Sequence, residues 1–200
     1  MELGTQSIHE FLASLASKEP TPGGGTVAGL LAALSTSLGQ MVLAYTEGKK
    51  KYAEHETLHN DCISFLEASS AEALVLAEED ATAYKALNAL WKLDRDDSAR
   101  IASWNDALQN AIEVPLRTME LSERVLVTLQ TLVRKTNAML ASDLVIAAIL
   151  AEAAARAARL NVEINVRQME EGDARNALQE KTTSILRACK TTCKSIEDAC

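Results

Sequence analysis

A long stretch without a single charged side chain constrains the fold of this sequence more than any other feature. Residues 26–46 read TVAGLLAALSTSLGQMVLAYT. A helix that is apolar all round has to be buried, in a protein core or in a bilayer. Gly29, Gly39 and Gln40 interrupt the stretch, and it lacks a Trp or Tyr belt at each of its two ends. We therefore predict a buried central helix, not a membrane span, with small residues that let another helix, including one from a second subunit, approach closely.

The rest of the chain also has helical character. Hydrophobic residues make up 48% of the sequence but aromatic residues only 4%, which favours closely packed helices with small and aliphatic side chains. A capping box, Ser7 to Glu10, begins the first helix, and Pro115 predicts either a kink or two separate helices. We predict an all-α fold, a single up-and-down bundle of long antiparallel helices in one domain spanning residues 1–200. The expected helices cover residues 7–19, 26–46, 54–93, 98–136, 142–166 and 173–200.

Charge and cysteine content narrow the class of protein. The formal net charge of -8 argues against a nucleic-acid partner, because phosphate binding needs a concentrated basic patch. The four cysteines form no CxxC pair, and the N-terminus has no signal-peptide pattern. We expect a reduced, cytoplasmic protein that binds neither nucleic acid nor membrane.

The loop PTPGGG, residues 20–25, leads directly into the uncharged helix. Glycines allow close approach, and a helix N-terminus offers unpaired N–H donors and a positive dipole end, so the loop could cradle an anion. A tight packing turn that needs glycine explains the pattern equally well. Lys49 and Lys50 in GKKKY, residues 48–52, could supply cations to the same anion or belong to a solvated turn.

Two aspartates and two asparagines are candidates for chemistry. Asp80 follows Glu78 and Glu79 inside a helix, where like charges and any burial would raise its carboxyl pKa towards general acid or base use. Asp143 follows Ser142, the expected helix cap, where the helix dipole favours the ionised form. Asn161 and Asn165 share one face of an apolar helix, and their amides could bind a heterocycle or bond across the bundle.

The segment HETLH, residues 55–59, matches the HExxH pattern of zinc hydrolases. It follows the charged segment KKKYAE, and no downstream glycine and histidine complete a longer signature. We interpret it as a solvated helix face and predict no metal site.

Several motifs occur together in one order: PTPGGG, GKKKY, EEDATAY, TNAMLASD and LNVEIN. From about Ile8 to the C-terminal helix, the sequence resembles the formiminotransferase-cyclodeaminase/methenyltetrahydrofolate cyclohydrolase family. The resemblance implies an all-helical homodimer with folate sites near the subunit interface and no cofactor besides the tetrahydrofolate substrate. In this family a cyclodeaminase converts formiminotetrahydrofolate to methenyltetrahydrofolate and ammonia. A cyclohydrolase opens methenyltetrahydrofolate to formyltetrahydrofolate, and both reactions pass through a tetrahedral carbon between two nitrogens.

The resemblance also implies roles for particular residues. Asp80 would move the proton, and Asp143 would be an ionised partner that stabilises the cationic substrate. The pterin and bridge carbon would be oriented by Asn137, Ser142, Asn161 and Asn165. The carboxylates of the glutamate tail would be held by Gly23, Gly24, Gly25, Thr26, Lys49 and Lys50.

The sequence favours the cyclohydrolase over the cyclodeaminase. It shows no formiminotransferase domain, and Arg156 ahead of LNVEIN resembles the free-standing cyclohydrolases. The sequence departs from the family at KLDR, residues 92–95, and at Ala154 and Ala157, where relatives carry glycine and where methyl groups would narrow the site. Two alternatives therefore remain: a cyclodeaminase, and a helical protein that binds folate or another anion without turnover.

Overall fold

Six α-helices and three short 3-10 helices form residues 3–200, the part of the chain that the computed structural model describes, and this part contains no strand. The all-α prediction is confirmed. In chain order the elements are η1 (Leu3–Thr5), α1 (Ile8–Leu15), α2 (Gly24–Ala44), η2 (Lys50–His55), α3 (Glu56–Trp91), α4 (Ser98–Thr131), η3 (Ala138–Leu140), α5 (Ala141–Val166) and α6 (Asp173–Ala199).

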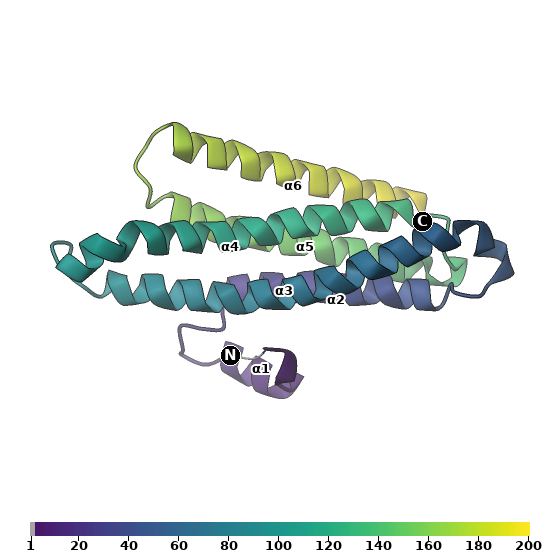
Figure 1. The fold of residues 1–200 in the computed structure, drawn as a ribbon, viewed down its shortest axis with the longest axis horizontal. Coiled ribbons are helices and arrows are strands. Elements are labelled where there is room, and N and C mark those ends of the chain that lie inside the picture. Colours follow the sequence, from purple (N-terminus) through teal and green to yellow (C-terminus); the bar gives the residue numbers. More distant parts are fainter. Residues whose placement is uncertain (1–2) are drawn as a thin grey trace.

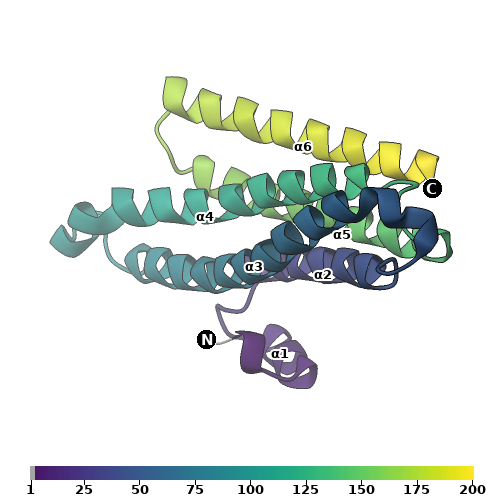
Figure 2. The ribbon, with the colours of Figure 1, turned by 45° about the vertical axis from the view of Figure 1, so that its right-hand side comes forward.

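The four helices α2 to α5 lie side by side along the long axis of the molecule (Figure 1). Helix α2 packs against α3 and α5, and α4 packs against α3 and α5. Helix α6 covers α4 and α5 from one side, whereas α1 lies apart on the other side, near the start of α2 (Figures 1 and 2). The core is aliphatic and rich in alanine, as the composition predicts.

Small residues determine how closely α2 approaches its neighbours. A Cβ atom at Gly29 would lie 2.7 Å from Cβ of Ala77, so only glycine permits this contact with α3. The Ser35 hydroxyl, fully buried, donates a hydrogen bond of 2.7 Å to the carbonyl of Ala147 in α5. The polar interruptions of the uncharged stretch are therefore packing and hydrogen-bonding positions within the bundle.

One side of α2 and of α5 remains uncovered in a single chain. Among the described residues, Gly24–Ala44 and Ala138–Val166 are the two segments that are long and apolar enough to cross a membrane. Each packs into the bundle with only part of its surface, so the prediction of a buried central helix is correct for half of α2. Exposed apolar side chains include Leu34, which is 48% exposed, and Leu160, which is 65% exposed.

Most predicted helix boundaries agree with the structure. Ser7 and Glu10 form the expected capping box, and α4 continues through Pro115 as one helix. The prediction that Ser142 caps a helix is wrong. Helix α5 begins at Ala141, so Ser142 lies in its first turn. The chain enters α5 through η3, and there the side chain of Asn137 accepts a hydrogen bond from the N–H of Met139.

Candidate functional site

The carboxylate of Asp80, on α3, lies against the N-terminus of α2. A Cβ atom added to Gly25 would overlap all three atoms of that carboxylate, so glycine at this position makes room for it. The backbone N–H of Thr26 donates a hydrogen bond to Asp80. The anion that this helix N-terminus holds is therefore the Asp80 side chain itself.

Burial raises the pKa of Asp80 from 3.8 to about 6, and the hydrogen bond from Thr26 opposes the shift only in part. The sequence suggested crowding by Glu78 and Glu79 as a cause, and that part of the expectation is wrong. The Glu78 carboxylate accepts a hydrogen bond of 2.7 Å from the N–H of Leu3. The Glu79 carboxylate forms an ion pair of 2.8 Å with Arg117. Both neighbours are directed elsewhere, and desolvation is the cause of the raised pKa.

This raised pKa predicts that the Asp80 carboxylate destabilises the fold at neutral pH. Well below pH 3.8 the group is protonated in both the folded and the unfolded chain, so it costs nothing. As the pH rises towards about 6 the unfolded chain loses the proton first, and the free energy of unfolding falls. We expect Asp80→Asn to raise the free energy of unfolding by about 1–3 kcal/mol at pH 8, and far less at pH 4. Urea denaturation at both pH values measures this, with exposed Glu67→Gln as control, and an equal effect at both pH values would contradict it.

Two further residues predicted for the site lie near the same end of α2. Thr26 is fully buried, and its hydroxyl oxygen has no hydrogen-bond partner among the described residues. Asn161 on α5 lies over the glycine loop, with its Oδ1 3.7 Å from the position of a Cβ atom on Gly24, and its Nδ2 donates to the carbonyl of Ala157. Helices α2, α3 and α5 thus each contribute to one cluster, which we call the carboxyl cluster: Gly23, Gly24, Gly25, Thr26, Asp80 and Asn161.

Asn165 lies one helical turn beyond this cluster. Its Nδ2 donates a hydrogen bond of 2.8 Å to the carbonyl of Ala111 in α4. Of the two uses considered for this amide, the bond across the bundle is the one that the structure contains. Two positions in this helix where the sequence departs from the family have different surroundings. Ala154 is fully buried in the core, whereas Ala157 lies one turn before Asn161. A methyl group at Ala154 therefore fills the core and does not narrow the site.

The remaining predicted residues gather at the opposite end of α2, and we call them the lysine cluster: Lys49, Lys50, Asn137, Ser142 and Asp143. Lys49 and Lys50 are exposed and help to line a cavity of about 180 Å³ between α2, η2 and α3. Asn137 joins the segments, because its N–H donates to the Thr46 hydroxyl at 2.9 Å and its Nδ2 donates to the Tyr45 carbonyl at 3.3 Å. The two lysines predicted for the site therefore lie at this end of α2.

A single chain does not bring the two clusters together. Asp143 and Asn161 both lie on α5, and about 27 Å of helix separates them at roughly 1.5 Å per residue. Helix α2 lies beside α5 and spans the same distance. Within one chain Asp143 cannot act beside Asp80, and Lys49 and Lys50 cannot meet an anion at the glycine loop.

Sequence analysis assigned no role to Tyr52, although it ends the GKKKY motif. Its hydroxyl, on a buried ring, accepts a hydrogen bond of 3.1 Å from the N–H of Ala138 and so ties η2 to η3. The aromatic residue at the end of the motif is the sequence signal that could have identified Tyr52.

The two histidines of the HETLH segment have different surroundings. His59 is buried, and its Nε2 donates a hydrogen bond of 2.8 Å to the carbonyl of Lys135. His55 lies next to Glu54, at 3.7 Å, just before α3 begins. Over residues 3–200 no three His, Cys, Asp or Glu side chains are grouped as metal ligands. His59 is a structural residue, so the prediction of a solvated face is wrong for this histidine.

Taken together, an all-helical bundle with a partly buried carboxyl group of near-neutral pKa defines a class of helical proteins equipped for acid–base chemistry. The chain belongs to the formiminotransferase-cyclodeaminase family, whose model matches residues 7–184. This is a family of folate one-carbon enzymes.

Individual relatives carry two different activities in their names. Methenyltetrahydrofolate cyclohydrolase of Methylorubrum extorquens is 32% identical over 172 residues, which cover 84% of this chain and 83% of that protein. Formimidoyltransferase-cyclodeaminase of Rattus norvegicus is 29% identical over 189 residues, which cover 92% of this chain but only 35% of the rat protein. The crystal structure of formiminotetrahydrofolate cyclodeaminase from Thermotoga maritima superimposes with a TM-score of 0.89 at 25% identity, covering 99% of this chain and 97% of that one.

Proposed function

We propose that this protein is a methenyltetrahydrofolate cyclohydrolase that uses Asp80 to move the proton. The observation that carries the proposal is the Asp80 carboxyl, held at the N-terminus of α2 with a pKa of about 6. Such a group is mostly ionised at pH 7 to 8 yet binds a proton readily, which suits both general base and general acid catalysis. The similarity to a cyclohydrolase along most of both chains supports the choice of reaction.

The reaction assigns two tasks to this carboxyl group. Water attacks the cationic carbon between the two folate nitrogens, and Asp80 accepts a proton from that water as the C–O bond forms. The tetrahedral carbon then loses its bond to one nitrogen, which takes a proton from Asp80. A C=O bond forms as the hydroxyl proton leaves to solvent, so the products are formyltetrahydrofolate and one released proton. The negative carboxylate also favours the cationic substrate in its neighbourhood.

The test is the loss of methenyltetrahydrofolate absorbance on addition of the purified protein, compared with the spontaneous rate in the same buffer. Acceleration that depends on Asp80 supports the proposal. Binding of methenyltetrahydrofolate, measured by calorimetry, without any acceleration would favour a folate-binding protein without turnover.

A cyclodeaminase activity is the second candidate, because the structure superimposes closely on the Thermotoga maritima cyclodeaminase. Closure of formiminotetrahydrofolate passes through the same tetrahedral carbon, with ammonia in place of water. Ammonia released from formiminotetrahydrofolate distinguishes the two reactions.

We also propose that two copies of the chain complete each site. The uncovered sides of α2 and α5 carry an apolar stripe defined by Leu34, Ile146, Ile149, Leu160 and Ile164, all between 43% and 65% exposed. A two-fold pair of chains packed through these stripes with antiparallel helices would place the lysine cluster of one chain opposite the carboxyl cluster of the other. The partner's cations would then hold the carboxylates of the folate tail while Asp80 faces the bridge carbon.

Mixing two inactive variants tests this arrangement. We expect Asp80→Asn and Lys49→Ala/Lys50→Ala each to be impaired, and co-expression to restore roughly a quarter of the native activity, since half of the dimers are mixed and each has one intact site. Co-expression of Asp80→Asn with Gly25→Ala is the matched control, and we expect no recovery because both changes affect the carboxyl cluster. Recovery in the control, or a monomer by light scattering, would overturn the proposed dimer.

A further inference from the structure

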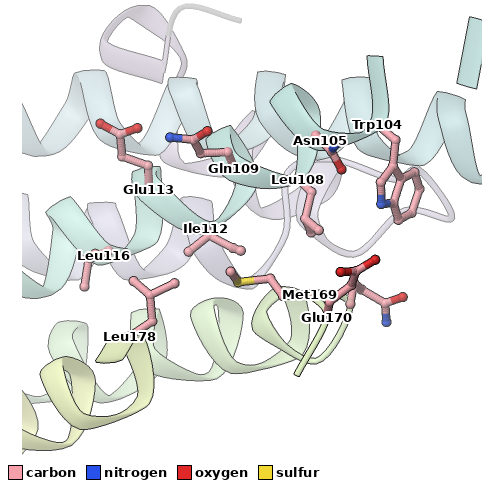
Figure 3. A pocket seen from close by; sticks show the side chains of 11 residues that line it. Trp104, Asn105, Leu108, Gln109, Ile112, Glu113, Leu116, Met169, Glu170 and Leu178 are labelled. Atoms are coloured by element: carbon pink, nitrogen blue, oxygen red, sulfur yellow. The ribbon is translucent and has the colours of Figure 1, made fainter. Parts of the chain in front are cut away.

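A cavity of about 690 Å³ lies between α4, the start of α6 and the loop that joins α5 to α6 (Figure 3). Its residues are Trp104, Asn105, Leu108, Gln109, Ile112, Glu113 and Leu116 on α4, Gln168, Met169 and Glu170 in the loop, and Leu178 on α6. No residue of the carboxyl cluster or the lysine cluster contributes to it. The cavity is therefore separate from the site proposed for folate.

The floor of this cavity is apolar. Leu108, Ile112 and Leu116 are buried along one face of α4, and Figure 3 shows Ile112 and Leu116 facing Met169 and Leu178 across the cavity. A concave apolar floor with a few polar groups at its edge is typical of sites for small molecules, whose volumes run from roughly 300 to 1,000 Å³.

The charged residues of the cavity are both acidic. Glu113 and Glu170 form no ion pair with any residue of the described chain, and no lysine or arginine lines the cavity. Figure 3 shows Glu113 at one end and Glu170 at the other, near Trp104.

Three of the cations near the cavity are engaged with other groups. Arg100 lies 4.6 Å from the centre of the Trp104 ring and donates to the Leu93 carbonyl. Arg175 and Lys181 on α6 pair with Glu171 and Glu120. The charged groups that line the cavity itself are two carboxylates, and they favour a cation over an anion.

We propose that this cavity binds a small organic cation with an apolar body and a protonated amine. The body fills the space above Ile112 and Leu116, and the ammonium group reaches a carboxylate at one end. The edge amides of Asn105, Gln109 and Gln168 accept its remaining hydrogens. An organic anion of the same size is disfavoured, because both carboxylates would repel it.

Dansylcadaverine is a suitable probe, because its emission rises on entry into an apolar site and its tail carries one ammonium group. N-dansyl-6-aminohexanoate has a similar size and a carboxylate instead. We expect the full-length protein to bind the cationic dye at least ten-fold more tightly than the anionic one in fluorescence titrations. Glu113→Gln/Glu170→Gln should weaken binding of the cationic dye about three- to five-fold, the scale of an exposed ion pair, without changing the far-UV circular dichroism.

Two controls separate this cavity from other binding sites. Glu19→Gln/Glu67→Gln removes the same charge from exposed positions outside the cavity and should leave the affinity unchanged, as should Asp80→Asn. The proposal is overturned by equal affinity for the two dyes, by an affinity that does not respond to Glu113 and Glu170, or by loss of binding in Asp80→Asn. Failure of the cyclohydrolase assay would not affect this result.

Discussion

Asp80→Asn should lower the turnover of methenyltetrahydrofolate about 10²–10⁴-fold, the usual contribution of a positioned acid–base group. The amide is nearly the same size and can still accept the hydrogen bond from the N–H of Thr26, so the fold should persist. The change removes proton transfer and the negative charge near the cationic substrate. The measurement is kcat from the absorbance assay, with circular dichroism to verify the helical content.

Glu79→Gln is the matched control for this change. Its carboxylate adjoins Asp80 in sequence but pairs with Arg117 on α4, so we expect less than a three-fold effect, the scale of a partly exposed ion pair. In the native enzyme kcat should fall as the pH drops through about 6, because protonated Asp80 cannot accept a proton from water. A native rate in Asp80→Asn, or an equal loss in Glu79→Gln, would show that another group moves the proton.

Gly25→Ala should produce the second large loss, through displacement of the same carboxylate. The added methyl group would overlap the carboxylate of Asp80, so α2 and α3 must separate or the side chain must rotate away from the N–H of Thr26. Overpacking of this kind costs about 1–3 kcal/mol of stability. We expect a loss of kcat of at least about 10²-fold, because small misplacements of a catalytic group have effects on this scale.

Gly24→Ala tests whether the position, and not the loss of a glycine as such, matters. Gly24 is exposed, and its added Cβ would lie 3.7 Å from Oδ1 of Asn161, an ordinary contact. We expect its stability to change by less than about 1 kcal/mol and its kcat to remain within a few-fold of the native value. Equal damage at Gly24 and Gly25 would indicate that loop flexibility, not room for the carboxylate, explains the glycines.

The glycine loop illustrates where local sequence patterns stop being informative. The sequence allowed either an anion cradle or a packing turn before the uncharged helix, and both descriptions turn out to hold, because the cradled anion is a side chain of the same chain. No pattern in residues 20–26 reveals that Asp80, on another helix, lies there. Likewise, the EED run suggested repulsion between neighbouring carboxylates, but Leu3 and Arg117 draw the two glutamates away.

The sequence by itself determined the helices, the aliphatic character of the core, the family and the identity of Asp80 as a candidate acid–base group. Periodicity, caps and ordered motifs are local properties, and helices form from local hydrogen bonds. Only the tertiary structure decided which residues meet. It buried Asp80 at a helix N-terminus, engaged Asn165 and His59 in structural hydrogen bonds, and left Asp143 about 27 Å of helix away from Asn161. Burial and distance arise from packing between helices far apart in the chain, and a linear sequence does not contain them directly.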